Sequence, residues 1–97
     1  MDWNDFRHSL QQDHPPTGLG VALESLWHAG KEDWESAHQL VNDLESADAM
    51  LVHAYLHRIE PDLSNAAYWY RRAGTKLPEI PPQQEWELLV KKLLTKY

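Results

Sequence analysis

Apolar residues recur along most of the chain at spacings of three and four, which is the period of an amphipathic helix. No segment shows a convincing alternation of apolar and polar residues, the pattern that is typical of a half-buried strand. The sequence therefore predicts an all-α protein. The expected helices lie at about residues 3–10, 19–29, 34–44, 48–59, 62–73 and 83–96.

Prolines and glycines mark the expected ends of these helices. The first helix is expected to end before Pro15, because the residue before a proline is pushed out of helical geometry. Gly30 is suited to a left-handed cap, and Gly74 ends a helix that begins after Pro61. Three further prolines predict a loop over residues 75–82.

The last predicted helix has the clearest apolar stripe, and we expect it to cap the helices before it. The stripe consists of Trp86, Leu89, Val90, Leu93, Leu94 and Tyr97. Trp27 and Trp34 fall on similar stripes, so these tryptophans are expected in the core rather than on a stacking platform for a ligand. The helix near the N-terminus is expected to dock on the rest of the domain.

A faint internal duplication aligns residues 23–42 with residues 52–71 at an offset of 29. Under this offset identical residues coincide, and apolar positions also match. The identical pairs are His28 with His57, Asp33 with Asp62, and Ala37 with Ala66. Repeated helical hairpins stack to bury faces that a single hairpin leaves exposed. We therefore expect one domain, 1–97, with hairpins at about 19–45 and 48–74.

The second hairpin resembles tetratricopeptide-class repeats, and more closely Sel1-type repeats. The resemblance rests on Ala66, Trp69, Tyr70 and Ala73, whereas the first hairpin keeps only Ala37 of this pattern. It implies two helical hairpins, with the N-terminal helix docked on them and the C-terminal helix as a cap. The strings LWHAGKEDWESAH and HAYLHRIEPDLSNAAYWYRRAG are also similar to small bacterial proteins, a resemblance that implies no function.

Composition narrows the class of protein. The 97 residues suffice for one compact domain, and the absence of cysteine excludes disulfides and thiolate metal sites. The N-terminal residues lack the basic start and apolar run of a signal peptide. No stretch approaches the roughly 18 apolar residues of a membrane-spanning helix. We therefore expect a cytoplasmic protein without a membrane segment.

Charge is unevenly distributed along the chain. Residues 1–64 carry 12 acidic and 3 basic side chains, and residues 65–97 carry 3 acidic and 6 basic ones. The formal net charge is −6. Because most of the surface would repel a phosphate backbone, we do not expect the protein to bind nucleic acid.

Two pairs of side chains suggest a metal site. Glu24 and His28 are four residues apart on one predicted helix, and His53 and His57 occupy the matching positions on another. If the two helices stack side by side, three imidazoles and one carboxylate converge, a ligand set suited to zinc, nickel, cobalt or iron. No cofactor is expected unless these residues bind such a divalent transition metal.

A structural interpretation competes with the metal site. His28 and Asp33 are five residues apart across one turn, and His57 and Asp62 are five apart across the other. Each pair would form a latch that satisfies the carbonyls at a helix C-terminus. Unpaired, solvated histidines are a third alternative.

A basic aromatic patch is expected on the helix at 62–73. Tyr68, Arg71 and Arg72 lie on the face opposite to its buried positions, and both residue types are favoured at binding hot spots. The competing interpretation is a surface ion pair between Arg72 and Asp43, which the offset places at the same level.

No nucleophile elbow or phosphate-binding loop is present, so conventional catalysis is poorly supported. The sequence predicts a protein-interaction or adaptor module whose partner is a protein or peptide, with homodimerisation left open. The rival hypothesis is a small metal-binding protein or metal-dependent enzyme.

Overall fold

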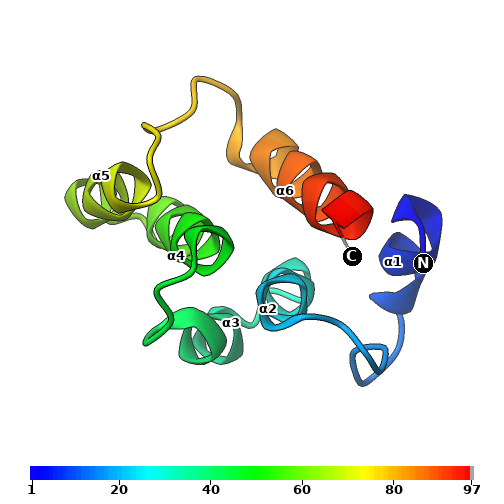
Figure 1. Ribbon diagram of the computed structural model, residues 1–97. Coiled ribbons are helices and arrows are strands. Elements are labelled where there is room, and N and C mark those ends of the chain that lie inside the picture. Colours follow the sequence, from blue (N-terminus) through cyan, green and yellow to red (C-terminus); the bar gives the residue numbers. More distant parts are fainter. Residues whose placement is uncertain (97) are drawn as a thin grey trace.

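The computed structural model describes residues 1–96 and confirms the all-α prediction, with no strand in that range. Tyr97, the last position of the predicted C-terminal stripe, lies outside the described residues. The helices are α1 (Trp3–Ser9), α2 (Val21–Gly30), α3 (Trp34–Val41), α4 (Ala47–Ile59), α5 (Leu63–Arg72) and α6 (Pro82–Lys96) (Figure 1). None of these six is long and apolar enough to cross a membrane.

The first four residues of a helix have backbone N–H groups without partners inside the helix. Side chains that precede three of these helices accept hydrogen bonds from such groups. Asp33 caps α3 by accepting from the Ser36 amide, and Asp62 caps α5 by accepting from the Asn65 amide. Ser46 caps α4 in the same way. Local sequence chemistry therefore determines where these helices begin.

The turns before α3 and α5 are alike: each has an aspartate as the capping residue and the same kind of backbone hydrogen bond. The Asp33 amide donates to the His28 carbonyl at 2.9 Å, and the Asp62 amide donates to the His57 carbonyl at 2.6 Å. Each aspartate is thus tied to the histidine five residues earlier through the backbone. As a result α2 and α4 end 29 residues apart, and α3 and α5 begin 29 residues apart.

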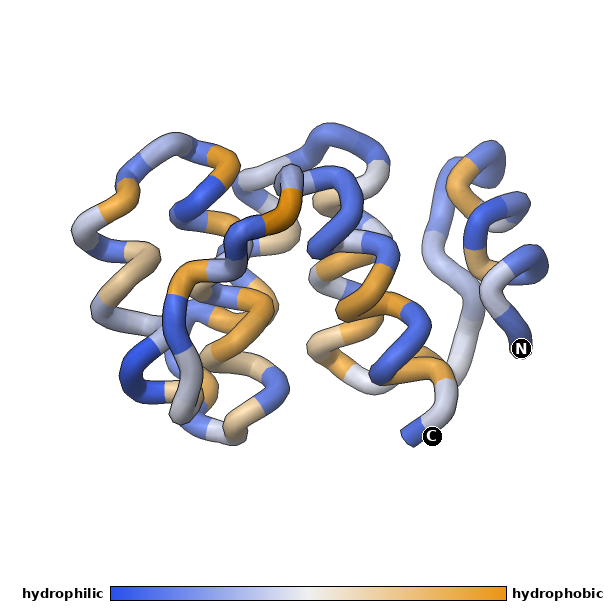
Figure 2. Tube along the Cα trace, turned by 90° about the horizontal axis from the view of Figure 1, so that it is seen from above, coloured by the Kyte–Doolittle hydropathy of each residue, from blue (hydrophilic) through white to orange (hydrophobic). Residues whose placement is uncertain are grey.

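Helix α6 folds back over the helices that precede it (Figure 1). It packs against α2 and α4, with α1 on its other side (Figure 1). Hydrophobic and hydrophilic residues are interspersed along the helices in Figure 2, as is typical of amphipathic helices. The cap predicted from the apolar stripe therefore completes the core from the side, where Leu89, Val90 and Leu93 are buried.

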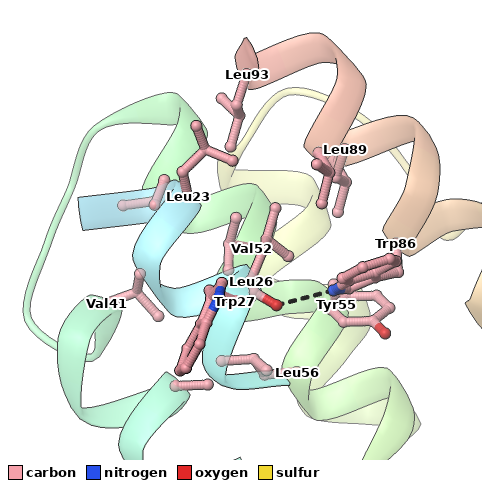
Figure 3. Packing of buried hydrophobic residues seen from close by; sticks show 14 of the residues in the cluster. Leu23, Leu26, Trp27, Val41, Val52, Tyr55, Leu56, Trp86, Leu89 and Leu93 are labelled. Atoms are coloured by element: carbon pink, nitrogen blue, oxygen red, sulfur yellow. Dashed lines mark hydrogen bonds between the residues drawn. The ribbon is translucent and has the colours of Figure 1, made fainter. Parts of the chain in front are cut away.

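Two of the three tryptophans expected in the core are buried. Trp27 is 1% exposed and Trp86 is 6% exposed, whereas Trp34 is only partly buried at the edge of the same cluster. The Trp86 indole donates to the Leu26 carbonyl at 2.9 Å (Figure 3). This hydrogen bond satisfies the buried indole N–H and fixes α6 to α2.

Gly30 does not form the left-handed cap that the sequence suggested. It is the last helical residue of α2, and the left-handed residue in the turn is Glu32, with φ of 61°. Gly30 is needed for close packing, because a Cβ there would lie 2.8 Å from the Trp86 ring and 3.1 Å from the Leu10 side chain.

We expect Gly30→Ala to lower the free energy of unfolding by about 1–3 kcal/mol, the usual cost of overpacking a core. The Trp86 ring cannot easily yield, because it is hydrogen-bonded and lies 5.7 Å from the Trp3 ring, centroid to centroid. Urea denaturation measures the effect. Gly20→Ala is the control, since a Cβ at Gly20 meets nothing within 4 Å. Unchanged or increased stability of Gly30→Ala would contradict this account.

Candidate functional site

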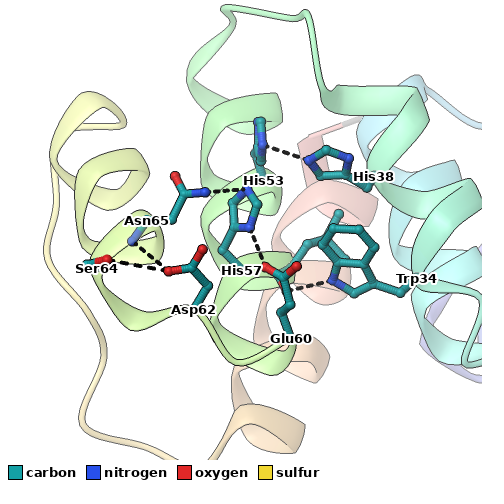
Figure 4. Close-up of polar contacts among 9 residues, drawn as sticks. Trp34, His38, His53, His57, Glu60, Asp62, Ser64 and Asn65 are labelled. Carbon is teal, nitrogen blue, oxygen red and sulfur yellow. Dashed lines mark hydrogen bonds and ion pairs between the residues drawn. The ribbon is translucent and has the colours of Figure 1, made fainter.

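Three imidazoles converge between α3 and α4. His38 comes from α3, and His53 and His57 lie one turn apart on α4 (Figure 4). One nitrogen from each ring lies within 4.8 Å of the other two, and His38 Nε2 is 3.1 Å from His53 Nε2. We refer to these three residues as the histidine cluster.

Two tryptophans hold the rings of the histidine cluster in place. His38 stacks on Trp34 with 4.6 Å between ring centroids and 11° between planes. His53 stacks on Trp69 at 4.0 Å and 20°. The Trp34 indole is itself fixed, since it donates to the Leu56 carbonyl at 2.7 Å. Helices α3, α4 and α5 therefore all contribute to the orientation of the cluster.

Glu60 and Asn65 flank His57. His57 Nδ1 lies 2.9 Å from a Glu60 carboxylate oxygen, and His57 Nε2 lies 3.4 Å from Asn65 Nδ2 (Figure 4). A carboxylate accepts hydrogen bonds only, so Nδ1 carries the proton in this pair. The lone pair of His57 Nε2 is therefore available to a hydrogen-bond donor or to a cation.

Burial favours the neutral form of two of the three rings, those of His38 and His53. His53 is 2% exposed. Burial, followed by the charges of His57, His38 and Arg72, lowers the pKa of His53 to about 4. Burial and His57 also lower the pKa of His38. Neutral imidazoles retain the lone pair that metal coordination requires.

One nitrogen of the cluster has no partner. His53 Nδ1 is buried and is the only buried side-chain polar atom without a hydrogen-bond partner among residues 1–96. Such atoms are rare in folded proteins, and each one calls for an explanation. Packing alone does not supply one for His53.

The structure brings together two of the four ligands predicted from the sequence. His53 and His57 belong to the cluster, whereas the potential metal-binding groups found within residues 1–96 contain neither Glu24 nor His28. These two side chains are partly buried on α2, and the His28 ring lies against Trp27 at 5.1 Å. The third imidazole comes instead from His38, which the sequence analysis missed.

The five-residue spacing of histidine and aspartate, which occurs in both turns, has a backbone explanation. The Asp33 carboxylate bonds to the Ser36 hydroxyl and amide, and these bonds lower its pKa. The Asp62 carboxylate caps α5. The side-chain partner of His57 is Glu60, so the side-chain latch proposed for Asp62 is not the arrangement seen.

A second group of side chains lines the outer face of α5, and we call it the α5 surface. It consists of Tyr68, Arg71 and Arg72, all of them exposed. The Arg72 guanidinium lies 4.8 Å from the Trp69 ring centroid and 5.8 Å from that of Tyr68. Its ion-pair partner is Glu45 at 3.8 Å, rather than Asp43.

Trp69 connects the two regions, because its ring contacts His53 of the cluster and Arg72 of the α5 surface.

Comparison with known proteins gave no match to a family model, a curated protein or a solved structure.

Proposed function

We propose that the protein is an interaction module that binds an acidic segment of a partner protein through the α5 surface. The observation that carries the proposal is the pairing of two exposed arginines with an exposed tyrosine on a helix that contains no acidic residue. Tyrosine and arginine are enriched at binding hot spots because both combine a large apolar area with hydrogen-bonding groups.

Charge favours this face over the rest of the molecule. The chain carries a net charge of −6, so an acidic segment is repelled by most of the surface and attracted to α5. Arg71 makes no ion pair within residues 1–96. Arginine also offers a planar fork that matches the two oxygens of a carboxylate.

Arg72 is positioned for the same role. Its contacts with the Trp69 and Tyr68 rings restrict the side chain before a partner arrives, which reduces the entropy lost on binding. Its pair with Glu45 is long, and the Glu45 side chain is 81% exposed. An ion pair of this kind contributes about 0–1 kcal/mol, so a partner carboxylate readily replaces it.

The proposal includes a repeat architecture of the tetratricopeptide class for the two hairpins. Support comes from the equivalent turns, 29 residues apart, and from Ala37 and Ala66, which are both fully buried at matching positions. Small residues at such positions allow neighbouring helices to approach closely. In this arrangement α5 is the last helix of the row and presents its outer face to a partner.

The test is a titration with a short fluorescein-labelled peptide rich in glutamate and leucine, followed by anisotropy at low and moderate salt. We expect Arg71→Gln/Arg72→Gln to weaken binding by about tenfold or more, the size of a typical hot-spot loss. Lys92→Gln on α6 is the matched control, because it removes an exposed cation elsewhere and should leave affinity nearly unchanged.

Absence of peptide binding, or equal losses in the control and the double variant, would contradict the proposal. Sedimentation analysis of the parent protein should accompany the titration. A dimer that dissociates in the double variant would identify a second copy of the chain, rather than an acidic segment, as the occupant of the α5 surface.

A further inference from the structure

The histidine cluster has nearly the dimensions of a metal centre. Bonds of about 2.0–2.1 Å in a tetrahedral zinc site place two ligating nitrogens about 3.3 Å apart. The His38 and His53 Nε2 atoms are already 3.1 Å apart. One nitrogen of His57 lies within 4.8 Å of one nitrogen of each of the other two rings, so an approach of at most about 1.5 Å completes the site. We propose that His38, His53 and His57 together bind one divalent transition-metal ion.

A purely structural role explains the cluster poorly. The contact between His38 and His53 uses one hydrogen-bonding nitrogen of each ring. It leaves His53 Nδ1 buried without a partner, although the residue is 2% exposed. A neutral imidazole has one N–H and one lone pair, so in this contact only one of the two Nε2 atoms offers a lone pair to the other, whereas a cation held between the rings takes the lone pairs of both.

Glu60 acts as a positioning residue for the site. Metal-bound histidines usually donate their other ring N–H to a carboxylate or carbonyl, which fixes the tautomer and the ring orientation. The 2.9 Å contact between His57 Nδ1 and Glu60 has this form. Asn65 Nδ2, at 3.4 Å from His57 Nε2, makes only a weak hydrogen bond that a metal ion displaces.

The donor set indicates which ions are accepted. Neutral imidazole favours zinc, cobalt, nickel and copper, whereas magnesium and calcium require oxygen ligands. Three protein ligands leave a tetrahedral ion with one open position, which water or an exogenous ligand fills. His38 is the partly exposed member of the cluster.

The ring stacks make the cluster ready for binding and provide a signal. Trp34 and Trp69 restrain the rings of His38 and His53, so little conformational freedom is lost when the ion binds. Because these two tryptophans contact the ligands directly, cobalt or copper in the site quenches their fluorescence. This readout does not depend on any enzymatic activity.

The experiment uses tag-free protein that has been treated with a chelator and then dialysed. Cobalt is titrated while visible absorption and tryptophan fluorescence are recorded, and zinc is then added as a competitor. We expect one ion per chain, the intense absorption of a tetrahedral cobalt centre, displacement by zinc, and no response to magnesium.

Two histidine variants distinguish the cluster from the ligand set predicted by sequence. His38→Ala is expected to weaken cobalt binding by about 100-fold or more, because only two protein ligands remain. His28→Ala, on α2, is the matched control and should bind as the parent does. Parental binding by His38→Ala, or a comparable loss in His28→Ala, would overturn the proposal.

Glu60→Gln keeps the proposal testable even where a cluster variant unfolds. The Glu60 side chain is 41% exposed, so this substitution should leave the fold intact. We expect cobalt binding to weaken by about 10- to 100-fold. Parental affinity in this variant would exclude the positioning role of Glu60. A dissociation constant of the parent protein weaker than about 0.1 mM would overturn the whole assignment, whatever the outcome for the α5 surface.

Discussion

Replacement of Glu85 with leucine is expected to lower the free energy of unfolding by about 3–5 kcal/mol, because it leaves a buried arginine without its counter-ion. Glu85 is 4% exposed, and its carboxylate accepts a hydrogen bond from Arg58 Nη1 at 2.8 Å. The Arg58 side chain is only 11% exposed, so water replaces the lost carboxylate poorly. Small domains are stable by only about 5–15 kcal/mol, so this is a large loss.

Tyr70 attaches α5 to the same carboxylate. Its hydroxyl lies 2.9 Å from Glu85 Oε1 and 2.7 Å from Oε2, and the residue is fully buried. Burial, followed by the hydrogen bond to Glu85, raises the pKa of the Tyr70 hydroxyl, which therefore stays protonated and donates. Arg58 Nη2 also donates to the Ile80 carbonyl. The Glu85 carboxylate of α6 thus joins α4 and α5, and Arg58 joins α4 to the loop after α5.

Urea denaturation followed by circular dichroism measures the loss. Glu87→Leu is the matched control on the same helix, since its side chain is 44% exposed and pairs with Lys91. We expect that control to change stability by less than about 1 kcal/mol. Glu85→Leu/Arg58→Met removes both buried charges and should recover part of the loss. Equal stabilities of Glu85→Leu and Glu87→Leu would contradict the argument.

The sequence could not reveal this network, although one signal was present. Glu85 precedes Leu89 by four residues and therefore lies on the buried face of the predicted C-terminal helix. A lone carboxylate on an apolar stripe implies a buried partner. Its identity depends on how α6 crosses α4 and α5, which is a tertiary property.

The helices themselves were predictable because their determinants are local. Asp62 and Ser46 cap the helices that follow them, and the prolines after Gly74 force a loop. The turn after α2 was predicted less well. Gly30 appeared suited to a cap, but contact with Trp86, more than fifty residues away, is what requires a glycine there.

The candidate metal site was half predictable for a related reason. His53 and His57 lie four apart on one helix, so helical geometry alone places them on one face. His38 lies one turn after Trp34 on α3, and the spacing of this pair was a usable signal. The 29-residue offset pointed to Glu24 and His28 on α2, whereas the packing of α3 on α4 supplies the third imidazole.

Acidification from pH 7 to pH 4 is expected to destabilise the metal-free protein by about 3 kcal/mol through His53 alone. The pKa of His53 is about 4 in the folded protein, against an ordinary value of 6.5. Above pH 6.5 the imidazole is neutral in both states and contributes no pH dependence. Below it, the unfolded chain takes up a proton that the folded protein refuses, at about 1.36 kcal/mol per pH unit. The loss is complete near the folded pKa.

The pH window separates His53 from the carboxylates. The pKa of Asp33 is lowered from 3.8 by its bonds to Ser36, so its contribution is present above that value and is lost only in more acidic solution. The pKa of His38 is lowered as well, so it adds to the histidine effect in the same direction. Denaturation at several pH values measures the combined effect of His53 and His38 on the free energy of unfolding. EDTA in the buffer prevents metal binding from contributing.

His53→Gln is the variant that assigns the pH dependence. Glutamine can hydrogen-bond to His38 but cannot stack on Trp69, so the variant should be less stable at pH 7. Because glutamine does not titrate, the variant should lose less stability on acidification. Most of the slope between pH 6.5 and pH 4 should disappear, with the part due to His38 remaining. If the parent and the variant show the same slope, His53 already accepts a proton in the folded protein. Water would then reach the cluster, and the neutral imidazoles on which metal coordination depends would be lost at mildly acidic pH.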